Sequence, residues 1–267
     1  MRVLARRRSS RLRAQTFEAV LDSRAVRTRK LLLSLSGVAT LVALWSLAIA
    51  LHPATILPGP LKVLSGVVDL ARRGLLARHV VASLFRVTWG YVLAVLVGIP
   101  LGLCLGWWRR ADRAVNPFLQ ILRPISPLAW IPISILWFGV GDGAAVFIIF
   151  LGAVLPITVA ATNAVAAVPS VHLRAARNFG LGSRELLVRV IFPSVLPQLI
   201  VGMRVALGVA WLVVVAAEMI AVNSGLGFLI VDARNAGNRY DLVVAGMVLI
   251  GVIGYGLDVG MRRLERT

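Results

Sequence analysis

Four ionisable side chains lie inside strongly apolar stretches of this 267-residue chain, and they are its best candidates for chemistry: Arg86, Arg123, Arg204 and Glu218. A charge within an apolar helix is costly unless it pairs with an opposite charge or faces water, so such residues mark functional sites by default. Arg204 and Glu218 lie on one stretch but about 21 Å apart along a helix, so they cannot pair with each other. The role that they suggest is in a pathway across the membrane.

The sequence lacks the residue sets of the common enzymes. Its only lysines, Lys30 and Lys62, do not end a G-x-x-x-x-G-K run, so the chain has no P-loop with which to hydrolyse ATP. It contains no paired carboxylates, no metal-binding cluster and no Ser-His-Asp set, and the single Cys104 excludes an internal disulfide. We therefore expect no enzyme, no cofactor and no bound metal.

The composition places the chain in a membrane. Hydrophobic residues make up 59% of it, its mean hydropathy is +0.87, and apolar runs of about 20 residues recur, each long enough to cross a bilayer. A net charge of +18 would suggest nucleic acid in a soluble protein. Here the arginines lie between apolar runs, which predicts a lipid bilayer and no nucleic acid as the partner.

The apolar runs predict an all-α, polytopic protein with about six transmembrane helices. Residues 1–30 form a basic tail, and residues 31–267 form one membrane domain with its core at about 80–262. An outer surface helix is expected at 61–80, and a short helix follows Gly225-Leu226-Gly227 in an outer loop. The six expected spans are at about 31–51, 83–106, 117–138, 144–168, 196–222 and 242–261.

The arginines and lysines orient these spans. With both termini inside, 20 of the 29 Lys and Arg residues lie in inside segments and six in outside segments. This asymmetry satisfies the positive-inside rule. We therefore expect cytoplasmic N- and C-termini.

Prolines and glycines give three spans special roles. Pro124, Pro127 and Pro132 cannot share one straight helix, and broken backbone at membrane depth is tolerated where it lines a watery cavity. We therefore expect 117–138 to form a pathway wall. Gly98-x-x-x-Gly102-x-x-x-Gly106 predicts close helix packing on the second span, and Gly256-x-x-x-Gly260 predicts the same on the last.

A polar stretch at 171–197 separates two very apolar blocks. It predicts a short helix over His172 to Phe179, which Gly180 and Gly182 end, and a second helix with Ser183 as its cap. We expect Gly180 at a helix C-terminus with positive φ. The two helices and the turn between them should lie outside the bilayer.

Motifs in this loop and its flanks resemble a known family. Ala175-Ala176, Gly180 and Val190-x-Phe192-Pro193 resemble the cytoplasmic coupling loop of ABC importer permeases, usually written E-A-A, G, I-x-L-P. Arg174 stands where that family usually has Glu, so the contact of that Glu is not carried over. Further motifs are similar to the subfamily that imports nitrate, taurine and alkanesulfonates: Pro124-x-Ser126-Pro127-Leu128-Ala129-Trp130-x-Pro132, Leu136-Trp137-Phe138-Gly139, and Ala210-Trp211 to Ala217-Glu218-Met219.

The resemblance implies a type I importer permease in the bacterial inner membrane. It implies two permease copies, two ATPase subunits that meet the loop, and a solute-binding protein outside. The loop residues that it implicates are Arg174, Ala175, Ala176, Gly180, Ser183 and Pro193. The pathway candidates are Pro124, Pro127, Trp130, Pro132, Trp137, Arg204, Trp211 and Glu218.

Several alternatives stay open at this stage. Trp137 and Trp211 could line the pathway, but tryptophan near an interface is more often an anchor. Glu218 could equally cap a helix or bond to a neighbouring one. A self-sufficient secondary carrier would need coupling-ion ligands and internal repeats, and a basic membrane anchor would not need three prolines in one span. The resemblance suggests a small anion as the solute, without identifying it.

Overall fold

The computed structural model describes residues 33, 36–51, 57–235 and 237–265, which fall into two compact units, 1–62 and 63–267. The predicted basic tail, 1–30, lies outside the described residues. The first unit contains an apolar helix, Ser36–Leu51, that is shorter than 18 residues. It covers most of the span predicted at 31–51, and the first residues of that span lie largely outside the described part.

The described residues form helices and no strand, which confirms the all-α prediction. Four helices, α3, α6, α9 and α11, are long and apolar enough to cross a membrane. The helices are α2 (Pro60–Arg72), α3 (Leu75–Trp107), α4 (Arg109–Leu122), α5 (Ile131–Phe138), α6 (Asp142–Ala166), α7 (Ser170–Asn178), α8 (Ser183–Glu185), α9 (Phe192–Glu218), α10 (Leu226–Asn235) and α11 (Tyr240–Glu265), with a 3₁₀ turn η1 (Pro127–Trp130) and a π-helical turn η2 (Leu186–Ile191).

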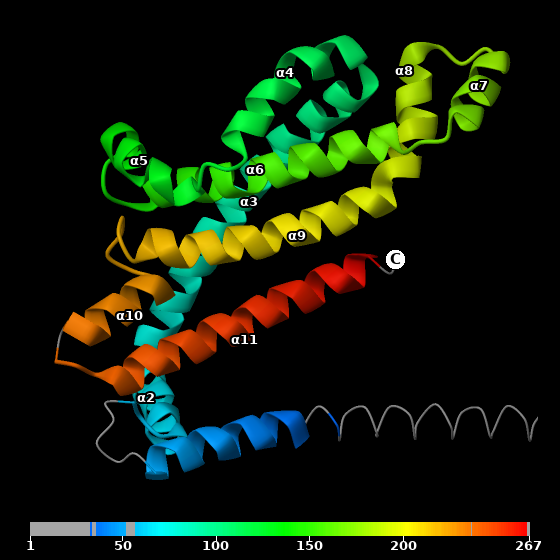
Figure 1. Ribbon diagram of the computed structural model, residues 1–267. Helices are drawn as coiled ribbons and strands as arrows, with labels where there is room; N and C mark the ends of the chain where they lie inside the picture. Colours follow the sequence, from blue (N-terminus) through cyan, green and yellow to red (C-terminus); the bar gives the residue numbers. More distant parts are fainter. Residues whose placement is uncertain (1–32, 34–35, 52–56, 236, 266–267) are drawn as a thin grey trace, which may run out of the picture. The chain divides into compact units, whose positions relative to one another are not determined.

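Within the second unit, α6, α9 and α11 run side by side, and α3 crosses them (Figure 1). The short helices gather at the two ends of this bundle. α5 and α10 lie at one end, here called the α10 end, and α7 and α8 lie at the other, the α7 end (Figure 1). The connections between spans therefore form two separate surfaces.

The most extensive contact between two helices of the bundle joins α3 to α6. A Cβ added at Gly102 would lie 2.5 Å from the Thr158 carbonyl oxygen, and one at Gly98 would lie 2.9 Å from Ile157. Side chains on this seam are fully buried, among them Ala94, Ala153 and Ala161. The packing role predicted for the glycines on α3 is confirmed. Small residues suit such seams because lipid gives apolar helices no hydrophobic reason to associate.

The matching prediction for α11 is not met within one chain. Among the residues that the structure describes, none lies within 4 Å of a Cβ added at Gly256 or Gly260. The close contacts of α11 occur instead at Gly246, against Ile230, and at Gly254, against Trp211. Within the chain, α11 therefore packs through a different face from the one that carries Gly256 and Gly260, and the role of that face stays a prediction.

Two element boundaries differ from prediction. The outer helix ends at Arg72 rather than Val80, because Gly74 takes a left-handed conformation (φ 71°) and breaks the chain. α3 then begins at Leu75, eight residues before the predicted second span. Its extra turns carry His79, which accepts a long-range hydrogen bond described below.

The predicted third span is broken. The η1–α5 segment turns by 86° from α4. Together the two segments are long and apolar enough to cross a membrane as one bent span. The break falls at Arg123–Ser126, beside Pro124 and Pro127. Ser126 Oγ accepts a hydrogen bond from Leu128 N and starts the new turn. The prolines therefore mark the break as expected.

Gly102→Ala should destabilise the protein, because its new methyl group meets the Thr158 carbonyl. We expect a loss of about 1–3 kcal/mol, typical of overpacking. Gly256→Ala is the matched control, since its methyl group enters open space and alanine favours a helix. Thermal unfolding in detergent compares them. Equal unfolding temperatures for the two variants would contradict the seam.

Candidate functional site

The α7 end carries a sharp helical corner. The N–H of Leu181 donates to the Ala176 carbonyl (3.2 Å) and the N–H of Gly180 to the Arg177 carbonyl (2.9 Å). These two bonds define a Schellman motif, whose first residue beyond the cap favours glycine. Gly180 occupies that position with φ 80°, which confirms the predicted turn. The corner fixes the angle between α7 and α8.

The second half of the loop is wound in an unusual way. The predicted cap is wrong by one residue: Gly182 precedes α8, and Ser183 is its first residue, with no side-chain cap bond. Glu185 is instead within 3.4 Å of the Gly182 N–H. After α8 the chain forms the π-helical turn η2 before Pro193 continues α9. Such turns recur at functional sites.

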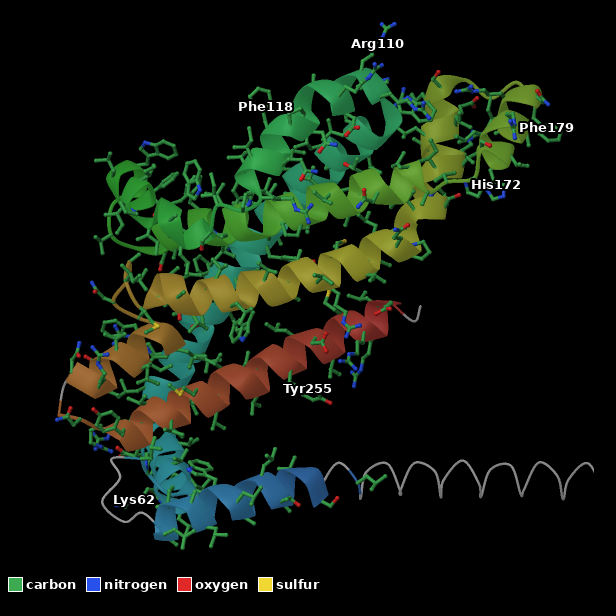
Figure 2. The ribbon with its side chains drawn as sticks, in the orientation of Figure 1. Lys62, Arg110, Phe118, His172, Phe179 and Tyr255 are labelled. Atoms are coloured by element: carbon green, nitrogen blue, oxygen red, sulfur yellow. The ribbon has the colours of Figure 1, made fainter. Side chains whose placement is uncertain are left out.

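The loop is anchored on one side and exposed on the other. Leu186 and Ile191 are 1% exposed, and Ile191 packs with Ala164 and Val165 at the end of α6. Phe179 is 85% exposed at the tip of the loop, with Val171 also exposed nearby. Figure 2 shows Phe179 pointing away from the bundle. A large aromatic side chain held outside the apolar spans is suited to a protein partner.

A cavity of about 670 Å³ lies between the broken span, α6 and α9. Its walls are apolar, apart from Arg123 and Asn163. Two of the predicted pathway residues, Pro127 and Trp130, line it. Val154 and Val205, the middle residues of α6 and α9, also line it, so the cavity lies at mid-depth in the bundle.

A buried ion pair joins the helices at the α10 end. Arg86 Nη1 donates to Glu218 Oε1 at 2.8 Å, with the side chains 3% and 0% exposed. Arg86 also donates to Asp142 (2.7 Å) and to the hydroxyl and carbonyl oxygens of Ser224. One guanidinium on α3 thereby ties the start of α6, the end of α9 and the chain before α10.

Polar groups complete this cluster around Glu218. Its second oxygen accepts from Ser83 Oγ (2.8 Å) and from the N–H of Gly227 (3.0 Å). His79 Nδ1 accepts from the N–H of Gly225 (3.1 Å). Gly225 has φ 108°, and a Cβ there would collide with the Glu218 carboxylate. Within the described residues, no buried side-chain N or O atom lacks a partner.

Arg204 meets a different set of carboxylates. Its Nε donates to Asp258 (2.6 Å) and its Nη1 to Glu265 (3.1 Å), both on α11. These bonds join the middle of α9 to the C-terminal half of α11. A pathway role for Arg204 and for Glu218 stays a prediction, since each already has bonds that explain its charge.

The remaining pathway candidates are dispersed. Trp211 is 6% exposed, and its Nε1 donates to the Ile250 carbonyl (3.1 Å), so it packs between α9 and α11. Trp137 is 61% exposed and meets Phe147 edge-on. Pro132 begins α5, and Pro124 lies at the break. Pro127 and Trp130 are the candidates that the structure brings together.

Sequence reasoning missed the partners in the buried cluster. Ser83, Asp142 and Ser224 are separated from their partners by 56 to 138 positions, so no local pattern reveals them. A signal was nevertheless present. Arg86 lies near the start of one predicted span and Glu218 near the end of another that runs the opposite way, so two opposite charges share one membrane level.

These features are those of a polytopic membrane protein with a mid-depth cavity and an exposed loop at one end. Residues 94–267 match the family described as "Binding-protein-dependent transport system inner membrane component". The chain belongs to this family.

Relatives across most of the chain agree. An ABC transporter permease protein of Methanocaldococcus jannaschii is 39% identical, covering 90% of this chain and 92% of the relative. Taurine transport system permease protein TauC of Escherichia coli is 34% identical (90% and 89%). Bicarbonate transport system permease protein CmpB of Synechococcus elongatus is 34% identical (88% and 88%). A chain of the inward-facing MetNI methionine ABC transporter has the same fold, with a TM-score of 0.65 at 21% identity, covering 72% of this chain and 95% of that one.

Arg86→Met should destabilise the protein strongly, because it leaves the Glu218 carboxylate buried without its cation. Loss of one partner of a buried pair costs about 3–5 kcal/mol. Asp142→Asn is the matched control at the same guanidinium, and we expect a smaller loss because Asp142 is 59% exposed. Thermal unfolding of both variants and of Arg86→Met/Glu218→Met measures the coupling. A double variant no more stable than Arg86→Met would contradict the pairing.

Proposed function

We propose that this chain is the permease subunit of an ATP-driven importer of a small anion. The observation that carries the proposal is the α7–α8 loop: an anchored, sharply cornered surface at one end of a spanning bundle, with an apolar tip that none of the described residues covers. Such a loop is what an ATPase needs in order to move the spans. The family to which the chain belongs supports this assignment.

The proposed partners follow from this assignment. Two ATPase subunits would bind the α7 end, where the loop carries Arg174, Arg177, Arg184 and Arg189. The positive-inside rule makes that end cytoplasmic and the α10 end external. A second copy of the chain would complete the pathway, and a solute-binding protein would dock at the α10 end. The sequence provides no P-loop, so ATP hydrolysis is assigned to the separate subunits.

The solute class is inferred from the relatives. TauC is named for taurine, CmpB for bicarbonate, and a Bacillus subtilis relative 32% identical to this chain for aliphatic sulfonates. All three solutes carry an anionic oxygen group. A small oxyanion is therefore our proposal for this chain too.

The mechanism we propose is a two-state switch. ATP-driven closure of the ATPases would move the two loops together. Because Ile191 packs against the end of α6 and η2 continues into α9, a displaced loop carries the cavity-lining helices with it. The cavity would then open alternately to the two sides.

A reconstitution experiment tests the function. In proteoliposomes loaded with ATP, this chain with its ATPases should accumulate the solute of its binding protein, and the chain alone should hydrolyse no ATP. Uphill uptake by the chain alone, driven by a proton or sodium gradient, would instead establish a secondary carrier.

Gly180→Val should uncouple transport from ATP hydrolysis. Positive φ strains a side chain by roughly 1 kcal/mol or more, which should leave the bundle assembled but change the angle of the corner. Gly182→Val is the matched control, because Gly182 has φ −70° and open space around it. We expect the first variant to lose uptake and the response of ATPase activity to the loaded binding protein. Normal values for both activities would show that the corner is not part of coupling.

A further inference from the structure

The three arginines within the spans are not equivalent in the structure. Arg86 pairs with Glu218 and Asp142, and Arg204 pairs with Asp258 and Glu265. Among the residues that the structure describes, no carboxylate or other side chain pairs with Arg123. A cation at membrane depth needs a partner or water, so an unpaired one demands an explanation.

Arg123 lies at a special place in the chain. It follows the last residue of α4, where the broken span turns by 86° beside Pro124. The bend lies against α6 (Figure 1). The Arg123 side chain is exposed and lines the 670 Å³ cavity. The prolines thus place a cation at the rim of a half-open cavity, where Val205 is also exposed.

Few other charged or polar side chains line the cavity beside Arg123. No acidic residue is among those that line it, and its one other strongly polar side chain is the neutral amide of Asn163. The opposite walls, at Val154 and Val205, are the midpoints of α6 and α9. Apolar walls weaken dielectric screening, so a single charge there sets the potential of the whole cavity.

We propose that Arg123 is the anion-selecting residue of this cavity, and that its guanidinium is the transient ligand of a small oxyanion such as a sulfonate. The proposal rests on the importer function proposed above. A guanidinium presents a planar fork of donors that matches two oxygens of one anion. With the other span arginines neutralised, the cavity holds one positive charge, which attracts a monoanion without trapping it between two cations.

Charged thiol reagents measure the potential directly. In a Cys104→Ala background, Val205→Cys places a thiol in the cavity, and Val159→Cys provides a second position on α6 in case the first variant fails to fold. The full chain in proteoliposomes is treated with the anionic 2-sulfonatoethyl methanethiosulfonate or with its cationic trimethylammonium counterpart. The ratio of the two rates reports the sign of the local charge.

Arg123→Gln should lower the anion-to-cation rate ratio by roughly tenfold, the effect of removing one charge several ångströms away in a partly screened space. Arg123→Lys should keep the ratio high, and Arg110→Gln, the matched control on the same helix, should leave it unchanged. An unchanged ratio in Arg123→Gln would overturn the proposal, and would indicate that a second copy or a lipid phosphate neutralises Arg123. Failure of both thiols to react would overturn it as well, because the cavity would then be closed to water.

This measurement needs no ATPase and no knowledge of the natural solute. If Arg123→Gln leaves the anion-to-cation rate ratio unchanged while ATP-driven uptake is normal, the role of Arg123 is rejected and the importer function is retained. If Arg123→Gln lowers the anion-to-cation rate ratio but no ATP-dependent uptake occurs, the anion site is retained and the importer function is rejected.

Discussion

The buried ion pair between Arg86 and Glu218 is the constraint on which the bundle depends. It lies where α3 crosses α9, and its hydrogen bonds extend to α6 and to the start of α10. Burying two charges costs more than their attraction returns unless every remaining donor and acceptor is also bonded. Here they are bonded, so the crossing cannot shift by one residue without leaving a charge unpaired. The pair sets the register of four helices at once.

Small residues then allow the helices to reach that register. Gly98 and Gly102 on α3 let its backbone approach α6 so closely that a single methyl group would collide. The polar bonds at the α10 end and the close packing along the middle both hold α3 against α6. The loop at the α7 end, by contrast, is held to the bundle by apolar contacts around Ile191. The bundle is therefore most firmly fixed at the end opposite to the loop, and the loop is the part best placed to move.

Much of this fold was predictable, because the signals are local. Apolar run length found the spans, prolines found the break, and the spacing of Gly180 found the corner. The predictions that failed depend on contacts between residues far apart in the sequence. Gly256 and Gly260 have the same spacing as the glycines of α3, and only the neighbour decides which stripe is buried. Ser183 missed the cap position by one residue, since Gly182 is extended there. Pairings such as Arg204 with Asp258 depend on which helices become adjacent, and a single sequence does not state this. The cavity likewise exists only once three elements are assembled.

The π-helical turn at Leu186–Ile191 has a consequence for how such a loop diversifies. A π turn holds one more residue than the α-helical path it replaces. Deleting one residue there would restore regular winding and rotate everything before it by about 100° about the α9 axis. The direction in which Phe179 and the corner point is thus set by how many residues separate them from Pro193, and less by which residues those are. Relatives with different partner surfaces have a simple genetic route to re-aim the loop: the gain or loss of a single codon.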